Sequence, residues 1–143
     1  MFHLIFNLNQ QLNLEIIFNE LEINENGTYR VNATKIKPYH FEYISIPKSE
    51  KYILKNNSPI FSKITFETKY LIQNISVTIY FTGKTIIICK DINDYENILS
   101  HIFKIIQLKE CTISNIKCYK IFYNTTIKKS EYETIMLNPL SIQ

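Results

Sequence analysis

Alternating apolar and polar residues mark strands at the start of the chain. Phe2 to Leu8 alternates with a period of two, and Leu12 to Phe18 does the same after a polar break. This pattern predicts a pair of strands. A helix from Gln10 to Leu21 is the competing interpretation of the second segment. The Asn-Glu-Asn-Gly sequence that ends at Gly27 then predicts a turn.

The next segment predicts a strand, a short helix and a second strand in succession. Tyr29 to Ile46 predicts a long strand, with a bulge or bend at Pro38 because proline cannot donate a ladder hydrogen bond. Pro47 to Lys55 predicts a short helix that begins with proline at its first position. Ile60 to Thr68 predicts another strand, and residues 69–74 form either a loop or an extension of that strand.

The clearest pattern is a hairpin followed by a helix. Ser76 to Phe81 and Thr85 to Lys90 flank a Thr-Gly-Lys turn that contains Gly83, one of only 2 glycines in the chain. Asp91 to Leu108 then repeats apolar residues every three or four positions, which predicts an amphipathic helix. Thr112 to Tyr123 predicts a further strand, and the segment after it carries no clear pattern.

These elements predict an α+β fold in a single domain that spans residues 1–143. The short connections imply a mainly antiparallel sheet. The two helices, at 47–55 and 91–108, would cover one face of the sheet and leave the other face open. An open apolar face on a protein surface needs a partner to explain it.

Composition adds modest information about partners. The net charge of +3 and pI of about 8.7 are compatible with nucleic-acid binding. Ala33 is the only alanine and Arg30 the only arginine, a bias typical of an AT-rich genome such as that of a large DNA virus. Lysine in place of arginine excludes the bidentate contacts that arginine makes to phosphate and guanine.

Several classes of function find no support in the sequence. Cys89, Cys111 and Cys118 lie in apolar or strand-like contexts without a zinc-binding spacing, so we expect reduced thiols, an intracellular protein and no metal site. No segment is typical of a signal peptide or a membrane span. Two glycines cannot form a glycine-rich phosphate loop, and no catalytic triad or metal motif occurs. We therefore expect no enzyme activity and no cofactor.

Three features that follow one another along the chain resemble those of a repeat in the TATA-binding protein family. The matching features are a valine-asparagine pair, a proline just before a phenylalanine, and an aromatic residue three positions before a glycine-lysine turn. The residues that carry them are Val31-Asn32, Pro59 with Phe61, and Tyr80 before Gly83-Lys84. The resemblance covers about residues 29–107 and implies a curved, mainly antiparallel sheet with two helices on one face.

The resemblance also implies roles for individual residues in the minor groove of A/T-rich DNA. Phe61 and Tyr80 would wedge between base steps and bend the duplex. Asn32 would bond to groove acceptors, with Asn115 as its partner from a second repeat. The phosphate contacts would come from Lys63 and Lys84, and the residues that pack on the groove floor would be Thr34, Thr78, Ile86 and Ile88.

The sequence also departs from that family. Residues 29–108 provide one complete repeat, residues 109–143 resemble a truncated second repeat, and the role of residues 1–28 is open. Tyr80 replaces a phenylalanine, and Glu67 falls near a position that is usually basic. A homodimer would rebuild the two-repeat saddle. Each named residue also has an ordinary interpretation as a core aromatic, a turn asparagine or a solvated lysine.

The sequence therefore predicts a DNA-binding transcription factor that binds and bends A/T-rich minor grooves. Its expected partners are double-stranded DNA and transcription proteins, and its expected location is the nucleus or a viral transcription site. The main alternative is a protein-interaction module of the same fold that has lost DNA binding. A third interpretation is an accessory domain that positions a nucleic-acid enzyme.

Overall fold

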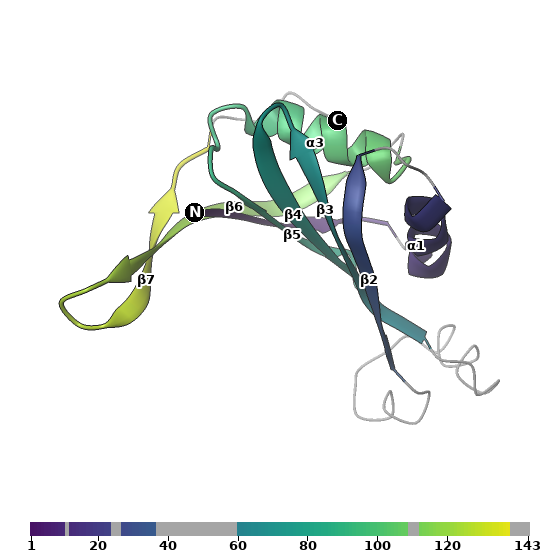
Figure 1. The fold of residues 1–143 in the computed structure, drawn as a ribbon, viewed down its shortest axis with the longest axis horizontal. Helices are drawn as coiled ribbons and strands as arrows, with labels where there is room; N and C mark the ends of the chain where they lie inside the picture. The colour runs from purple at the N-terminus through teal and green to yellow at the C-terminus, as the bar shows by residue number, and fades with distance from the viewer. Residues whose placement is uncertain (11, 24–26, 37–59, 109–111, 138–143) are drawn as a thin grey trace.

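The computed structural model describes residues 1–10, 12–23, 27–36, 60–108 and 112–137. These residues form a curved sheet with helices against one face (Figure 1). In chain order the elements are β1 (Phe2–Leu8), α1 (Leu14–Ile23), β2 (Thr28–Ile36), β3 (Ile60–Tyr70), β4 (Gln73–Tyr80), β5 (Lys84–Cys89), α3 (Tyr95–Ile105), β6 (Ile113–Asn124) and β7 (Lys129–Ile135).

The described strands form one sheet of 7 strands in the order β2-β3-β4-β5-β1-β6-β7. Every neighbouring pair is antiparallel, which confirms the predicted α+β class with an antiparallel sheet. The N-terminal strand β1 lies inside the sheet, between β5 and β6. Residues 2–8 are therefore central to the sheet rather than an addition to a unit that begins at Tyr29.

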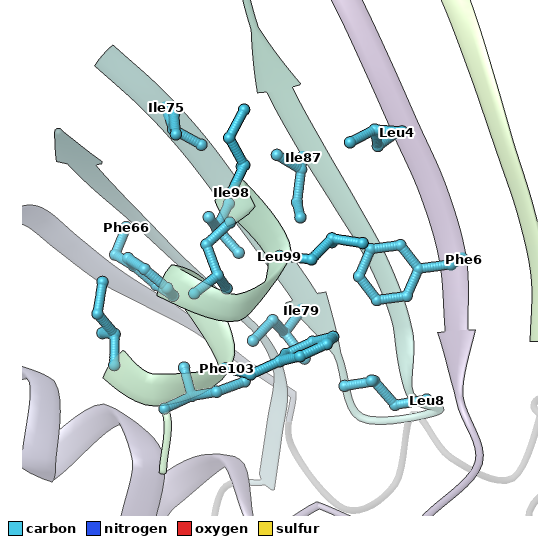
Figure 2. Close-up of a cluster of buried hydrophobic side chains, with 14 of the residues drawn as sticks. Leu4, Phe6, Leu8, Phe66, Ile75, Ile79, Ile87, Ile98, Leu99 and Phe103 are labelled. Carbon is cyan, nitrogen blue, oxygen red and sulfur yellow. The ribbon is translucent and has the colours of Figure 1, made fainter. Parts of the chain in front are cut away.

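Helix α3 packs across the sheet and forms the core with it. Its apolar side carries Ile98, Leu99 and Phe103, which point toward strand residues such as Phe6 and Ile87 (Figure 2). The rings of Phe6 and Phe103 meet edge to face at 6.2 Å between centroids. The period of three and four residues in the sequence therefore corresponds to the buried stripe of this helix.

The predicted second strand of an N-terminal pair is wrong, and the competing helix is correct. Residues 14–23 form α1, and the Oδ1 atom of Asn13 accepts a hydrogen bond from the backbone N–H of Ile16 at 3.2 Å. This contact satisfies one of the free donors at the start of the helix. Leu14 and Leu21 enter the core on the same side of the sheet as α3, while Ile16 is 58% exposed.

The central hairpin agrees with its prediction, and Gly83 is required where it stands. Gly83 has φ of +94°, and a Cβ atom there would lie 2.5 Å from the carbonyl oxygen of Leu8. The backbone N–H of Leu8 donates to the Gly83 carbonyl at 3.0 Å. The close approach of β1 to the turn thus excludes any side chain at this position.

The remaining boundaries differ in detail from those predicted. Strand β3 extends to Tyr70, so the segment after Thr68 begins as a strand extension and then turns at Leu71 and Ile72. Strand β2 ends at Ile36, and the predicted bend at Pro38 and helix at 47–55 lie outside the described residues. Strand β6 confirms the prediction at 112–123, and β7 occupies part of the segment without a clear pattern.

Candidate nucleic-acid interface

The side of the sheet away from α1 and α3 is called here the helix-free face. In an antiparallel sheet, directly opposed residues point to the same side. The register therefore defines three rows on this face. The first row contains Tyr29, Glu67, Ser76, Ile88, His3, Tyr119 and Thr134; the second contains Asn32, Thr65, Thr78, Ile86, Ile5 and Lys117; the third contains Thr34, Lys63 and Tyr80, with Lys84, Asn7 and Ser114 beyond the turn.

Most of the site residues expected from the sequence share this face. They are Asn32, Thr34, Lys63, Thr78, Tyr80, Lys84, Ile86 and Ile88. Thr78, Ile86 and Ile88 are half-buried among their neighbours, whereas Asn32 and Lys84 are exposed. The sheet thus brings residues from four strands onto one surface, as alternation along each strand predicts.

Phe61 is the exception, because its expected position on the open face is wrong. In β3 the register with β2 moves from Lys63 opposite Thr34 to Phe61 opposite Lys35, so Ser62 is an extra residue in the strand. This bulge reverses the alternation and turns Phe61 toward the helices. Phe61 is only 9% exposed, and its ring lies 5.5 Å from that of Phe18 in α1.

Tyr80 stays on the helix-free face, as the sequence predicts. Its ring is half-buried, and the Nζ atom of Lys63 lies 5.9 Å from the ring centroid. This distance permits a cation–π contact that orients both side chains. Of the two rings expected to act as wedges, only Tyr80 faces away from the core.

The expected pairing of Asn32 with Asn115 is also wrong. Asn32 lies on the edge strand β2, with β3, β4, β5 and β1 between it and β6, and its Nδ2 atom donates to the Arg30 carbonyl at 3.3 Å. Asn115 instead lies beside Asn7, whose register partner in β6 is Ser114. Asn115 has φ of 57° at the bulge between the two strands.

Asn7 is a candidate that sequence reasoning missed. It belongs to an N-terminal segment whose role the sequence leaves open, yet β1 occupies a central place in the sheet. The signal that could have found it is the polar residue in the alternating sequence Phe6-Asn7-Leu8, which resembles the Ser114-Asn115-Ile116 sequence of β6. Asn7 lies in the third row of the helix-free face, and Asn115 follows its register partner Ser114 on the neighbouring strand β6.

Charge is distributed unevenly between the two sides of the sheet. Lys63, Lys69, Lys84 and Lys117 belong to the helix-free face. Glu67 is the only carboxylate there among the described residues, and its Oε2 atom pairs with Arg30 at 3.0 Å. The other described carboxylates lie on α1, on α3 and the loop before it, or on the opposite side of β7.

His3, in the first row of the face, has a pKa that favours its neutral form. Burial, followed by the nearby N-terminal amino group, lowers the pKa of His3 below its usual value. His3 lies between Ile88 and Tyr119 in the first row. A neutral ring among apolar and hydroxyl-bearing side chains leaves the lysines to set the charge of the surface.

The two described cysteines do not form a reactive site. Burial raises the pKa of the Cys89 thiol to about 11 and also raises the pKa of Cys118. Both thiols are buried on the helix side of the sheet. A protonated, inaccessible thiol is a poor nucleophile and a poor metal ligand.

Two searches of the described part of the chain, for metal-binding clusters and for membrane-spanning helices, gave negative results. It contains no cluster of three or more histidine, cysteine, aspartate or glutamate side chains placed to hold a metal ion. Within the same residues, none of the helices has the length and apolar character needed to cross a membrane. Comparisons of the chain with protein-family models, with curated proteins and with solved structures found no match.

Proposed function

We propose that the helix-free face binds double-stranded DNA, in the minor groove of A/T-rich sequences, and that the protein acts in transcription. The observation that carries this proposal is the separation of charge. Lys63, Lys84 and Lys117 share a face on which the only described carboxylate, Glu67, is already paired. A broad sheet surface with an excess of cations suits a polyanion, and each phosphate contact releases a counterion.

The second row of the face suits a groove floor. Thr65, Thr78, Ile86 and Ile5 follow one another across four strands without a charged side chain. Short β-branched side chains permit a close approach to base edges, and hydroxyl groups can bond to the acceptors there. The minor groove of A/T pairs presents only such acceptors, so it fits this strip better than a G/C groove with its amino group.

Asparagine side chains beside this strip would supply the corresponding donors. Asn7 and Asn115 lie on adjacent strands, β1 and β6, beside the strip of small side chains. The repeat proposed from the sequence resemblance would include β1, because β1 lies inside the sheet between β5 and β6. In a repeat that includes β1, Asn7 would take the role that the sequence resemblance gives to Asn32.

The proposal includes only modest DNA bending. Tyr80 is the one ring of the expected pair that faces outward, while Phe61 packs in the core. Unstacking a base step costs a few kcal/mol, and apolar wedges inserted at several steps produce the largest bends. One tyrosine wedge is therefore expected to bend the duplex less than a pair of phenylalanines.

The test is a titration of blunt A/T-rich and G/C-rich duplexes at two salt concentrations, with end-to-end energy transfer to record bending. We expect salt-dependent binding that prefers A/T-rich DNA and that is weakened about tenfold by Asn7→Ala, within the range of about 1–3 kcal/mol for a good base contact. Asn97→Ala, on the exposed side of α3, is the matched control. Equal binding to both duplexes, or no binding at low salt, would overturn the proposal.

A protein-interaction module is the second candidate function. It is favoured by the burial of Phe61 and by the Arg30–Glu67 ion pair, which lowers the charge of the β2–β3 end. In that case the helix-free face would bind a transcription protein or a second copy of the chain. Absence of DNA binding at low salt, together with self-association in sedimentation, would favour this candidate.

A further inference from the structure

The β6–β7 hairpin carries an aromatic surface that shares only Tyr119 with the three rows of the helix-free face. Ile121 is opposite Tyr132, and Tyr123 is opposite Ser130, so these side chains share one side of the hairpin with Tyr119. This group of Tyr119, Ile121, Tyr123 and Tyr132 is called here the hairpin platform. The hairpin extends outward from the sheet (Figure 1), and Tyr119 of the first row begins the platform.

Two of the three platform rings, those of Tyr123 and Tyr132, are exposed, and the ring of Tyr119 is half-buried. Tyr132 is 68% exposed and Tyr123 is 59% exposed. The ring of Tyr119 meets that of Tyr132 edge to face, with centroids 5.4 Å apart and an angle of 89°. The contact limits the motion of Tyr132, so a flat partner that stacks on its exposed side meets an ordered ring.

The described carboxylates of the hairpin lie on the side opposite the platform. The platform joins Lys117, which precedes it on the same side of β6, and Lys128 lies in the turn at the tip. Glu131 and Glu133 lie on the opposite side together with Lys120 and Lys129, and Nδ2 of Asn124 donates to Glu131 there at 3.2 Å. No described carboxylate therefore lies on the platform side of the hairpin between Lys117 and the rings.

We propose that the hairpin platform binds unpaired nucleobases of a single strand that continues from the bound duplex. Exposed aromatic rings beside cations are the two components of single-strand binding surfaces, since bases stack on the rings while cations meet phosphates. Bases inside a duplex are stacked on one another and cannot offer their faces. This inference depends on the proposed function for the position of the duplex but concerns rings, those of Tyr123 and Tyr132, that lie outside the three rows of the helix-free face.

The experiment measures fluorescence anisotropy with four labelled probes at one low salt concentration. They are a blunt A/T-rich duplex, the same duplex with a single-stranded thymidine extension, the same duplex with an abasic extension of equal length, and the free thymidine strand. We expect the thymidine extension to tighten binding about tenfold, in line with roughly 1–3 kcal/mol per stacked base, and the abasic extension to add much less.

Variants then locate the effect. Tyr132→Ala should remove most of the gain from the thymidine extension and leave blunt-duplex affinity unchanged, whereas Tyr132→Trp should keep the gain. Phe122→Ala is the matched control, because Phe122 is 40% exposed on the opposite side of the same strand pair. Thermal denaturation of each variant confirms that it is folded before its binding is compared.

The outcomes separate the two proposals. Blunt-duplex binding with no gain from the thymidine extension overturns the inference alone, as does an equal gain from the abasic extension or an equal loss in Phe122→Ala. Binding of the free strand with no binding of the blunt duplex overturns the proposed function while supporting the platform. Absence of binding to all four probes overturns both.

Discussion

The ring of Phe61 lies 5.5 Å from the ring of Phe18, centroid to centroid, and this contact joins β3 to α1. Phe61 therefore packs in the core, although a strict alternation of side chains along β3 would place it on the helix-free face. Ser62, the extra residue at the bulge, causes this change, and its Oγ atom donates to the Thr34 carbonyl at 3.0 Å. One inserted residue therefore decides which side of the sheet receives the ring of Phe61.

Removal of this ring should destabilise the fold. Phe61→Ala is expected to lower the free energy of unfolding by about 3 kcal/mol, and Phe61→Leu by about 1 kcal/mol, because both leave a cavity against Phe18. Phe122→Ala, at an exposed position, should cost less than about 0.5 kcal/mol. Urea denaturation measures all three. A stable Phe61→Ala variant that loses DNA binding would instead place this ring at the interface.

The two glycines should respond differently to alanine. At Gly27, where φ is +75°, an added Cβ would have no other atom within 4 Å, whereas at Gly83 it would lie 2.5 Å from the Leu8 carbonyl oxygen. Gly27→Ala should cost about 1 kcal/mol from backbone strain alone. Gly83→Ala should cost about 3 kcal/mol, since β1 must also move away. Equal losses in thermal denaturation would show that β1 does not approach the turn this closely.

The lysines of the helix-free face should control the salt dependence of DNA binding. Lys63→Ala, Lys84→Ala and Lys117→Ala should each reduce the slope of log affinity against log salt by about 1. Lys104→Ala, on the exposed side of α3, should leave the slope unchanged. Titrations at four salt concentrations measure the slopes. A larger effect from Lys104 than from the other three would move the interface to the helices.

The thiol of Cys89 should be inert in the folded protein and should link stability to alkaline pH. Its pKa is raised by burial to about 11, above the ordinary value of 9.0, so the unfolded chain loses this proton first. The contribution of the protonated thiol to the free energy of unfolding is therefore full below pH 9 and is lost as the pH rises toward 11. Since Cys111 lies outside the described residues, the measurement uses Cys111→Ser and follows reaction with a thiol reagent at pH 8, with and without denaturant. Rapid reaction without denaturant would contradict the burial of this thiol.

The pattern of apolar and polar residues in the sequence was sufficient to predict several helices and strands. Apolar residues at helical spacing before Leu108 predict α3, since its buried stripe depends on local sequence. The turn at Gly83 predicts the β4–β5 hairpin for a similar local reason, because few residues adopt positive φ. Much of the helix-free face also follows from alternation, including Thr78, Tyr80 and Ile86.

Tertiary structure decided the rest. The pattern from Leu12 to Phe18 fits a strand as well as a helix, and burial of Leu14 and Leu21 against the sheet selects the helix. The position of β1 between β5 and β6 depends on pairing between residues far apart in the chain, such as Phe2 with Cys89, which no local pattern encodes. The bulge at Ser62 depends on hydrogen bonds to two neighbouring strands, so the sequence of β3 by itself could not show that Phe61 faces inward.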